Sequence, residues 1–132
     1  SRVAEQEIAG GAETPLVFAY HEIVAAPEPS EHYDPERCDV IYDSRVSPDF
    51  YGWVFPHGAS ASVGMGTYVR SVDLKAATAG LRASSGLAEC ETFRREGAPI
   101  PLKPLKRWDN GRDVVLAGDA AGVVAPSSGE GI

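Results

Sequence analysis

The sequence predicts an α+β protein with a largely antiparallel sheet, one helix and a terminal strand of different character. Short apolar segments bounded by turn residues predict the strands, and a single stretch of helical periodicity predicts the helix. The composition, with 43% hydrophobic and 23% charged residues, is that of a globular chain rather than a disordered tail. No stretch reaches the roughly 18–20 apolar residues that a membrane helix needs.

Proline and glycine mark the connections between the expected strands. Pro-His-Gly-Ala-Ser at 56–60 predicts a hairpin. Pro99, Pro101 and Pro104 force an extended path that interrupts a ladder of backbone hydrogen bonds. The expected strands are 16–24, 38–42, 50–55, 62–69 and 92–100.

Residues 73–85 are the expected helix. Asp73 can cap its amino end, and Gly86 can end it. The apolar positions that recur with helical spacing are Leu74, Ala77 and Leu81.

The last part of the sequence differs in character. The run 114–117 (VVLA) follows an Asn110-Gly111 turn, and we expect it to be a fully buried strand of a parallel sheet. A parallel partner requires a crossover connection that the sequence does not obviously supply. Residues 127–131 (SSGEG) resemble the beginning of a helix, and no helix follows them. These features predict an internal fragment of a longer protein.

The net charge of −7 is unevenly distributed. Residues 1–49 contain 11 acidic and 3 basic residues, a balance of −8, whereas residues 50–132 contain 8 acidic and 9 basic residues, a balance of +1. This distribution argues against nucleic acid as a partner. The basic excess either faces an anionic ligand or is solvated; its residues are Arg94, Arg95, Lys103, Lys106, Arg107 and Arg112.

Cysteines and histidines give no sign of a metal site. Cys38 and Cys90 show neither metal-ligand spacing nor a disulfide framework, so a reduced intracellular protein is expected. His21, His32 and His57 also lack the spacing of metal ligands, and we expect them to be structural or exposed. His57 is kept as a candidate catalytic residue because it directly follows an aromatic strand.

The Gly118-Asp119 pair is the first candidate for a binding role. Ligands of open α/β sheets bind beyond the carboxyl ends of strands, where an ionised Asp119 can accept hydrogen bonds from hydroxyl groups. Gly129 and Gly131 would let backbone N–H groups approach a phosphate or the edge of a flavin. The alternative is a simple turn after a strand. The GxxxxGK[ST] motif of a P-loop is absent.

The segment 48–56 (PDFYGWVFP) is the second candidate. Strand alternation places Tyr51, Trp53 and Phe55 on one face. Such a wall can pack against a planar cofactor or a prenyl chain, with the Tyr51 hydroxyl and the Trp53 indole N–H as its polar groups. Ordinary cross-strand packing in a core would produce the same pattern.

Three stretches together resemble the geranylgeranyl reductase family, above all its photosynthetic branch. They are the aromatic segment 48–56, the proline-rich stretch 94–104 (RREGAPIPLKP) and the segment 113–131 around Gly118-Asp119. These proteins are FAD-dependent and have a para-hydroxybenzoate hydroxylase-like fold. Residues 1–4 (SRVA) also resemble the residues after that superfamily's Asp-Gly motif. The GxGxxG fingerprint for the ADP half of FAD is absent, which again indicates a fragment.

The resemblance implies three segments and a set of site residues. Residues 1–12 would be the tail of an FAD-binding segment, residues 13–105 a β-rich substrate-binding domain, and residues 106–132 a truncated FAD-binding segment with the last strand of the α/β domain. The implied FAD contacts are Gly118, Asp119, Pro126, Gly129 and Gly131. The implied substrate contacts are Tyr51, Trp53, Phe55 and Pro56, and the candidate proton donors are Tyr51 and His57.

The implied activity is the reduction of double bonds in a geranylgeranyl chain to phytyl with FAD and NADPH, in (bacterio)chlorophyll or isoprenoid biosynthesis. The substrate would be a prenyl diphosphate or a prenylated tetrapyrrole. A cytoplasmic location or peripheral contact with the photosynthetic membrane is expected, and no signal peptide is recognisable. The fragment alone is expected to be inactive. A flavin monooxygenase of the same fold and a non-catalytic isoprenoid-binding module are the alternatives.

Overall fold

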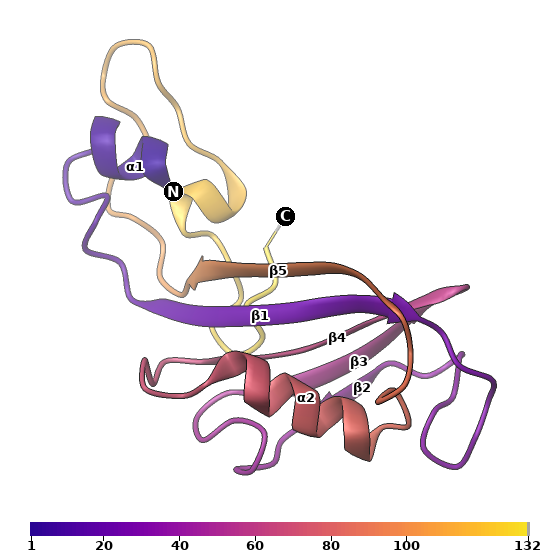
Figure 1. The fold of residues 1–132 in the computed structure, drawn as a ribbon. Coiled ribbons are helices and arrows are strands. Elements are labelled where there is room, and N and C mark those ends of the chain that lie inside the picture. Colours follow the sequence, from indigo (N-terminus) through magenta and orange to yellow (C-terminus); the bar gives the residue numbers. More distant parts are fainter. Residues whose placement is uncertain (132) are drawn as a thin grey trace. The chain divides into compact units, whose positions relative to one another are not determined.

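The computed structural model describes residues 1–131. Five strands form one sheet with the order β2-β3-β4-β1-β5 (Figure 1). β4 pairs antiparallel with β1 and with β3, and β3 pairs antiparallel with β2. The prediction of an α+β fold with a largely antiparallel sheet is confirmed. The strands are β1 (Leu16–Ala25), β2 (Asp39–Ile41), β3 (Gly52–His57), β4 (Ser60–Thr67) and β5 (Thr92–Pro101).

Two helices and a 3-10 turn accompany the sheet. They are α1 (Arg2–Glu7), α2 (Leu74–Ser84) and η1 (Gly118–Ala121). No helix within residues 1–131 is long and apolar enough to cross a membrane. The chain divides into two compact units: a sheet unit of residues 18–98, and a terminal unit that combines residues 1–17 with the segment that begins at Pro99.

The hairpin between β3 and β4 is tighter than the sequence predicts. β3 continues through Pro56 and His57, which pair with Ala61 and Ser60, so only two residues remain in the loop. β2 pairs with β3 only as far as Val54. At Pro56 the strand therefore has no neighbour on its β2 side, and the N–H group that proline lacks is not needed there.

The predicted helix is confirmed as α2. Asp73 caps it, because its Oδ1 accepts hydrogen bonds from the N–H groups of Lys75 and Ala76 at 3.1 and 3.0 Å. Gly86, with φ +72°, follows the helix in the left-handed conformation expected after a helix end.

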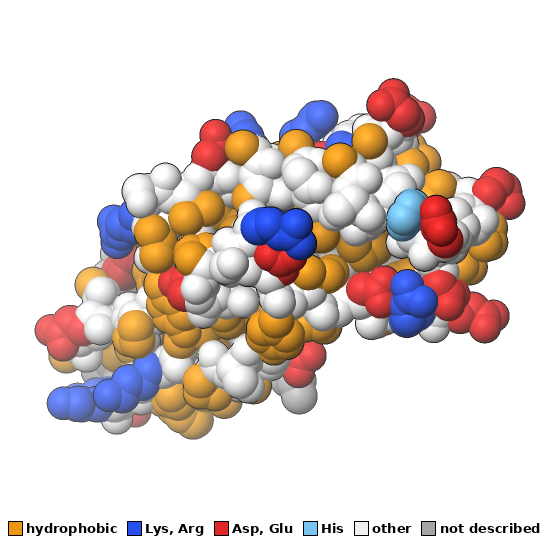
Figure 2. All heavy atoms as spheres, turned by 90° about the horizontal axis from the view of Figure 1, so that it is seen from below, with side chains coloured by type: hydrophobic (Ala, Val, Ile, Leu, Met, Phe, Trp, Pro, Cys, Tyr) orange, Lys and Arg blue, Asp and Glu red, His pale blue; other side chains and the backbone are white. Residues whose placement is uncertain are grey.

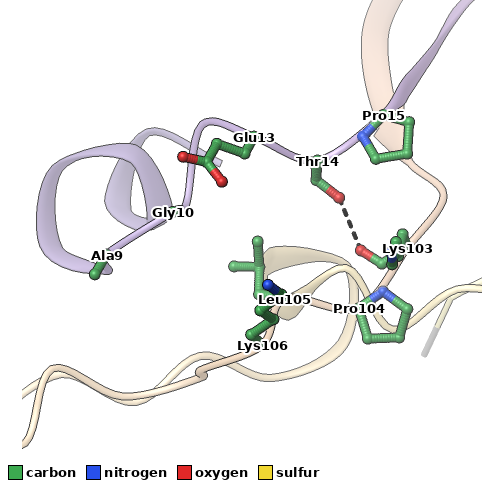
Figure 3. Close-up of a pocket in the computed structure, with 9 residues that line it drawn as sticks. All are labelled: Ala9, Gly10, Glu13, Thr14, Pro15, Lys103, Pro104, Leu105 and Lys106. Atoms are coloured by element: carbon green, nitrogen blue, oxygen red, sulfur yellow. Dashed lines mark hydrogen bonds between the residues drawn. The ribbon is translucent and has the colours of Figure 1, made fainter.

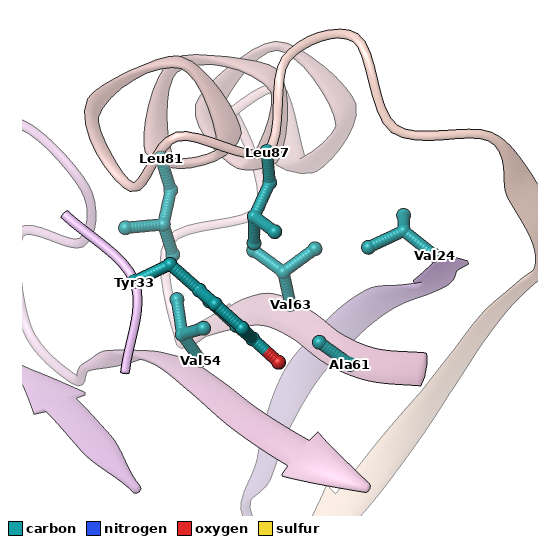
Figure 4. Packing of buried hydrophobic residues seen from close by; sticks show 7 residues of the cluster. All are labelled: Val24, Tyr33, Val54, Ala61, Val63, Leu81 and Leu87. Carbon is teal, nitrogen blue, oxygen red and sulfur yellow. The ribbon is translucent and has the colours of Figure 1, made fainter. Parts of the chain in front are cut away.

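One face of the sheet packs against α2. Leu81 from the helix and Leu87 from the following loop point onto Val54 and Val63 of the sheet (Figure 4). The ring of Tyr33 lies in the same cluster and is 1% exposed. Burial of this size contributes about 1.5–3 kcal/mol for each large apolar side chain. The cluster consists of Val24, Tyr33, Val54, Ala61, Val63, Leu81 and Leu87.

A buried ion pair adds a polar link between α2 and β1. Arg82 Nη1 lies 2.5 Å from Glu22 Oε2, and both side chains are nearly buried. The Tyr20 hydroxyl donates to Glu22 Oε1 at 2.8 Å, and Arg95 approaches the same oxygen at 3.4 Å. Burial alone would raise the pKa of Glu22, but the hydrogen bonds from Tyr20 and Arg82 and the charges of Arg82 and Arg95 outweigh it. The pKa is therefore lowered.

The run 114–117 is not the buried parallel strand that we expected. Val115 is 80% exposed and forms an isolated antiparallel bridge with Asp109 across the Asn110-Gly111 turn. Within residues 1–131 no strand lies parallel to this run, so its backbone pairs locally instead: Leu116 N–H donates to Trp108 O at 2.7 Å. Only Leu116 of the run is buried.

The short helix α1 was not expected from the sequence. Its Ala4, together with the adjacent Ile8, packs against Leu116 and Ala121 in a second apolar cluster. This cluster holds the terminal unit together. Six residues are too few for a helix to be stable alone, so its packing partners determine whether it forms.

Charges of both signs are interspersed on the face of the molecule that Figure 2 shows, and neither sign dominates there. Four of the six basic residues noted in the sequence approach carboxylates within 4 Å: Arg94 pairs with Glu96, Arg95 with Glu22, Arg107 with Asp109 and Arg112 with Glu7.

Removal of Arg82 should destabilise the chain strongly. In Arg82→Ala the Glu22 carboxylate stays buried without its main partner, which costs about 3–5 kcal/mol of the free energy of unfolding. Urea denaturation followed by circular dichroism measures the loss. Arg45→Ala removes an arginine that is 89% exposed and pairs with Asp43; it is the control and should lower the midpoint much less. Equal midpoints for the two variants would contradict the role of Arg82.

Stability should also depend on pH through Glu22. Its pKa in the folded chain lies below the usual 4.5, so its contribution is present above about pH 4.5 and is lost as the pH falls toward the lower value. In Glu22→Gln the free energy of unfolding should fall less steeply below pH 4.5 than in the unmodified chain. The exposed Glu89→Gln is the control. An unchanged slope in Glu22→Gln would refute this assignment.

Candidate functional site

The sheet has a second face, opposite α2, which we call the open face. Glu22 and Val24 point toward α2, so alternation along β1 directs His21 and Ile23 to the open face. In antiparallel pairing, residues directly opposite each other share a face. Gly64 lies opposite both His21 and Trp53, and all three therefore belong to the open face.

Aromatic rings form a continuous row on the open face. The ring centroids of Tyr51 and Trp53 are 5.9 Å apart, and those of Trp53 and Phe55 are 6.2 Å apart. The predicted placement of these three side chains on one face is confirmed. Tyr42 extends the row, 5.8 Å from Tyr51, and Phe50 stacks on Tyr51 at 4.4 Å. These separations fall within the favourable range for aromatic pairs.

Two of the predicted site residues in this segment do not join the row. Pro56 lies opposite Ala61, a member of the cluster under α2, and therefore faces that cluster rather than the open face. His57 is exposed at the end of β3, opposite Ser60. Their roles in substrate binding and proton transfer stay predictions.

A chain of hydrogen bonds runs beside the aromatic row. Trp53 Nε1 donates to Ser62 Oγ at 3.1 Å, and Ser62 Oγ lies 2.9 Å from His21 Nδ1. His21 Nε2 lies 3.0 Å from Glu96 Oε2, which Arg94 approaches at 3.2 Å. Three strands besides β3 thus contribute to this hydrogen-bond chain: β4 through Ser62, β1 through His21 and β5 through Glu96.

Sequence analysis missed this chain. It treated His21 as structural or exposed and gave Ser62 and Glu96 no role. Only the register of β1 with β4 brings His21 to Ser62. Tyr42 lies beside Tyr51 because the preceding Ile41 pairs with Gly52, and this register is likewise known only from the structure.

Gly64 allows Trp53 to lie across the sheet. A Cβ at this position would come 2.7 Å from Trp53 Cζ2 and 2.5 Å from His21 Cβ, closer than real contacts allow. The absence of a side chain therefore permits the indole to cover the centre of β4. Cross-strand pairs between glycine and a large aromatic are a known way to fill such a gap.

In the terminal unit, the Gly118-Asp119 pair opens the 3-10 turn η1. Gly118 has φ +55°, and Gly122 follows the turn with φ +76°. Asp119 is exposed, and within residues 1–131 its carboxylate has no hydrogen-bond or ion-pair partner. A Cβ at Gly131 would overlap Asp119 Oδ1, so any other residue at this position would require the carboxylate to move. The structure thus brings Asp119 and Gly131 together, as a shared binding role requires.

Gly118 and Gly131 line an open cavity of about 390 Å³, and Asp119 lies next to Gly118 without lining it. The size of the cavity lies at the lower end of the range for small-molecule sites. The free Asp119 carboxylate can accept hydrogen bonds from the hydroxyls of a ribityl chain, and the glycine backbone leaves space for close approach. These residues fit part of a flavin. Pro126 and Gly129 lie in the turn that precedes Gly131. The cavity is lined by Trp108, Leu116–Gly118, Val123–Ala125 and Glu130–Gly131.

A second cavity in the same unit, of about 180 Å³, lies between residues 9–15 and 103–106 (Figure 3). The Thr14 hydroxyl donates to Lys103 O at 2.8 Å and ties the two segments together. Glu13 and Lys106 bring opposite charges to its lining.

Comparison with solved structures shows a protein of similar fold. A crystal structure of a geranylgeranyl bacteriochlorophyll reductase-like protein from Thermoplasma acidophilum superposes with a TM-score of 0.69 at 22% identity, over 89% of this chain and 30% of that one. This likeness concerns the fold. No family model matches the chain.

The sequence relatives are more specific. The chain is 70% identical over 118 residues to a geranylgeranyl diphosphate reductase of Rhodobacter capsulatus, which covers 89% of this chain and 30% of that protein. It is 42% identical to the chloroplastic enzyme of that name from Oryza sativa, over 100% of this chain and 28% of the relative. The chain is homologous to a segment of the geranylgeranyl diphosphate reductases, and the predicted resemblance is confirmed.

A more distant relative is the digeranylgeranylglycerophospholipid reductase of Methanocaldococcus jannaschii, 31% identical over 77% of this chain and 27% of that protein. The chain spans less than a third of the length of each of these relatives. This coverage agrees with the expectation of a fragment.

Gly64→Ala should disturb both the sheet and the aromatic row. The added methyl group meets Trp53 and the β1 backbone, so the free energy of unfolding should fall by about 1–3 kcal/mol. The Trp53 contribution to the fluorescence emission should shift as the indole moves. Gly80→Ala, in open space on α2, is the control and should stabilise the chain slightly. Unchanged Trp53 emission and unchanged stability in Gly64→Ala would refute the proposed steric role of Gly64.

Proposed function

We propose that the chain is part of an FAD- and NADPH-dependent reductase that hydrogenates double bonds of a geranylgeranyl chain. The aromatic row of the open face carries this proposal. An isoprenoid chain has no hydrogen-bonding groups along its length, so a protein must hold it by apolar contact. The 70% identity to a geranylgeranyl diphosphate reductase supports the same assignment.

The open face would bind and orient the isoprenoid. Trp53 and Phe55 are partly exposed and offer flat apolar surfaces against which the methyl groups and double bonds of the isoprenoid can pack. Tyr51, which is 9% exposed, would add a small part of this surface. Their packing would also exclude water from the double bond, which favours transfer of hydride over its loss to solvent. Tyr51 and His57 are the proposed donors of the proton that completes the reduction.

The terminal unit would bind part of the flavin. Asp119 would accept hydrogen bonds from its ribityl or ribose hydroxyls, and Gly118, Pro126, Gly129 and Gly131 would give the backbone access to the isoalloxazine and the pyrophosphate. Bound FAD, once reduced by NADPH, supplies hydride for the double bond. The protein's part is orientation and exclusion of water.

The segment boundaries and the substrate belong to the same proposal. Residues 1–12 and 106–132 would form parts of the FAD-binding region, and residues 13–105 the substrate-binding domain. The substrate would be a geranylgeranyl diphosphate or a tetrapyrrole esterified with geranylgeraniol, whose lipid character fits peripheral contact with a photosynthetic membrane.

Product analysis tests the proposal in the full-length protein. Purified protein with FAD, NADPH and geranylgeranyl diphosphate should yield products whose mass increases by two hydrogens for each reduced double bond. A product that gains oxygen under air would indicate a flavin monooxygenase instead. Binding of geranylgeranyl diphosphate without any flavin or product would indicate a non-catalytic binding module. Either result would overturn the proposal.

Asp119→Ala should weaken FAD binding in the full-length protein. The lost hydrogen bonds to a charged carboxylate are worth about 1.5–3 kcal/mol, which corresponds to roughly a 10- to 150-fold increase in Kd. Titration of the apoprotein with FAD, followed by flavin fluorescence, measures the change. Asp113→Ala, an exposed carboxylate in the preceding turn, is the control. Equal affinities for both variants would remove Asp119 from the flavin site.

A further inference from the structure

We propose that His21 and Ser62 are positioning residues of the open face: they hold the Trp53 indole in place through a hydrogen-bond chain that runs from Trp53 to Glu96. The expected effect on substrate binding rests on the proposed function. The hydrogen-bond chain itself stands on the geometry of β1, β3, β4 and β5.

Trp53 is held on three sides. Its indole N–H donates to Ser62 Oγ at 3.1 Å. Its ring lies over Gly64, where no side chain could fit. The His21 ring lies beside it, with centroids 6.3 Å apart and planes tilted by 46°. Few orientations of a half-buried indole satisfy these contacts together, so the ring is fixed rather than free to rotate.

The donors and acceptors of the chain match only if His21 uses both of its nitrogens. With neutral His21, Nε2–H donates to Glu96, and Nδ1 accepts the Ser62 hydroxyl proton. Ser62 Oγ then accepts the Trp53 N–H. Each group is satisfied, and the chain has a single direction from Trp53 to Glu96. Burial of Ser62, which is 6% exposed, makes this pairing important.

The surroundings of His21 come from three strands. The groups that face its ring are Ser62 of β4, Trp53 of β3 and Glu96 of β5, with Arg94 on the far side of Glu96. The Glu96 carboxylate is 46% exposed, so the hydrogen-bond chain begins at the half-buried indole and ends at the protein surface.

The same geometry argues against a direct chemical role for Ser62. A nucleophilic serine must present its oxygen to a substrate, whereas Ser62 Oγ is buried and already bonded to Trp53 and His21. Both nitrogens of His21 are likewise engaged. The hydrogen-bond chain would therefore affect substrate binding through the position of the Trp53 indole. A fixed indole determines where a double bond can rest along the row.

The indole N–H of Trp53 reports directly on this chain. In full-length protein labelled with ¹⁵N-tryptophan and free of substrate, Trp53→Phe identifies the Trp53 signal. Ser62→Ala should accelerate exchange of this N–H with solvent about three- to tenfold, as expected for one lost hydrogen bond. Ser60→Ala removes a hydroxyl two residues away on the same strand and should have no effect. Trp108, whose N–H donates to Leu105 O, is the internal reference.

Two substitutions of His21 separate its two bonds. The amide of Asn reaches about as far as Nδ1, and the amide of Gln about as far as Nε2, so His21→Asn should keep the bond to Ser62 and His21→Gln should lose it. His21→Asn should therefore keep slow exchange of the Trp53 N–H, and His21→Gln should accelerate it.

Two results would overturn the proposal. They are unchanged exchange of the Trp53 N–H in Ser62→Ala and equal exchange in His21→Asn and His21→Gln. The first would mean that Ser62 does not hold the indole. The second would mean that the bond between His21 and Ser62 does not support it.

Kinetics with geranylgeranyl diphosphate test the consequence for binding. Ser62→Ala and His21→Ala should raise KM about three- to tenfold with little change in kcat, and His21→Asn should restore KM. A fall in kcat alone would show that the residues act on the chemical step and refute positioning. If the protein reduces no prenyl substrate, the proposed function is wrong. The tryptophan signals would still show whether His21 and Ser62 hold the Trp53 indole.

Discussion

The ion pair between Arg82 and Glu22 is the interaction on which the rest of the sheet unit depends. All three side-chain nitrogens of Arg82 donate hydrogen bonds. Besides Glu22, the acceptors are Thr92 Oγ1 and the carbonyl oxygens of Leu87, Ala88 and Cys90. One side chain thus joins the last turn of α2, the loop after it and the strands β1 and β5. Glu22 must face Arg82, so strand alternation determines on which face of the sheet each of the remaining residues of β1 lies.

That constraint also defines the open face. A slip of one residue in β1 would bury His21 under α2 and expose Glu22. Arg82 would lose its partner, at a cost of about 3–5 kcal/mol, which is a large part of the stability of a typical domain. The register of β1 with β4 then places His21 beside Ser62, and the register of β3 with β4 places Trp53 over Gly64. A polar contact on one face of the sheet thereby fixes the aromatic arrangement on the other.

The sequence predicts elements whose determinants are local, and it misses those that depend on distant partners. Asp73 and the spacing of Leu74 and Leu81 specify α2 without reference to the rest of the chain. The helix α1 is six residues long and needs Leu116 and Ala121, which lie more than a hundred residues away. The run 114–117 has the composition of a buried strand, but within the described residues no parallel partner exists, and local pairing across the Asn110-Gly111 turn prevails.

The candidate site shows the same division. Alternation within one strand suffices to place Tyr51, Trp53 and Phe55 on one face, whereas the chain from Trp53 to Glu96 needs the register of four strands. A wall made only of carbon would leave each ring free to find several packings, because apolar contact is not directional. The indole nitrogen is the one polar atom of the Trp53 side chain, and its hydrogen bond to Ser62 starts the hydrogen-bond chain. A single part-buried hydrogen bond can therefore give direction to an otherwise apolar surface, and a site that selects one double bond among several would require this property.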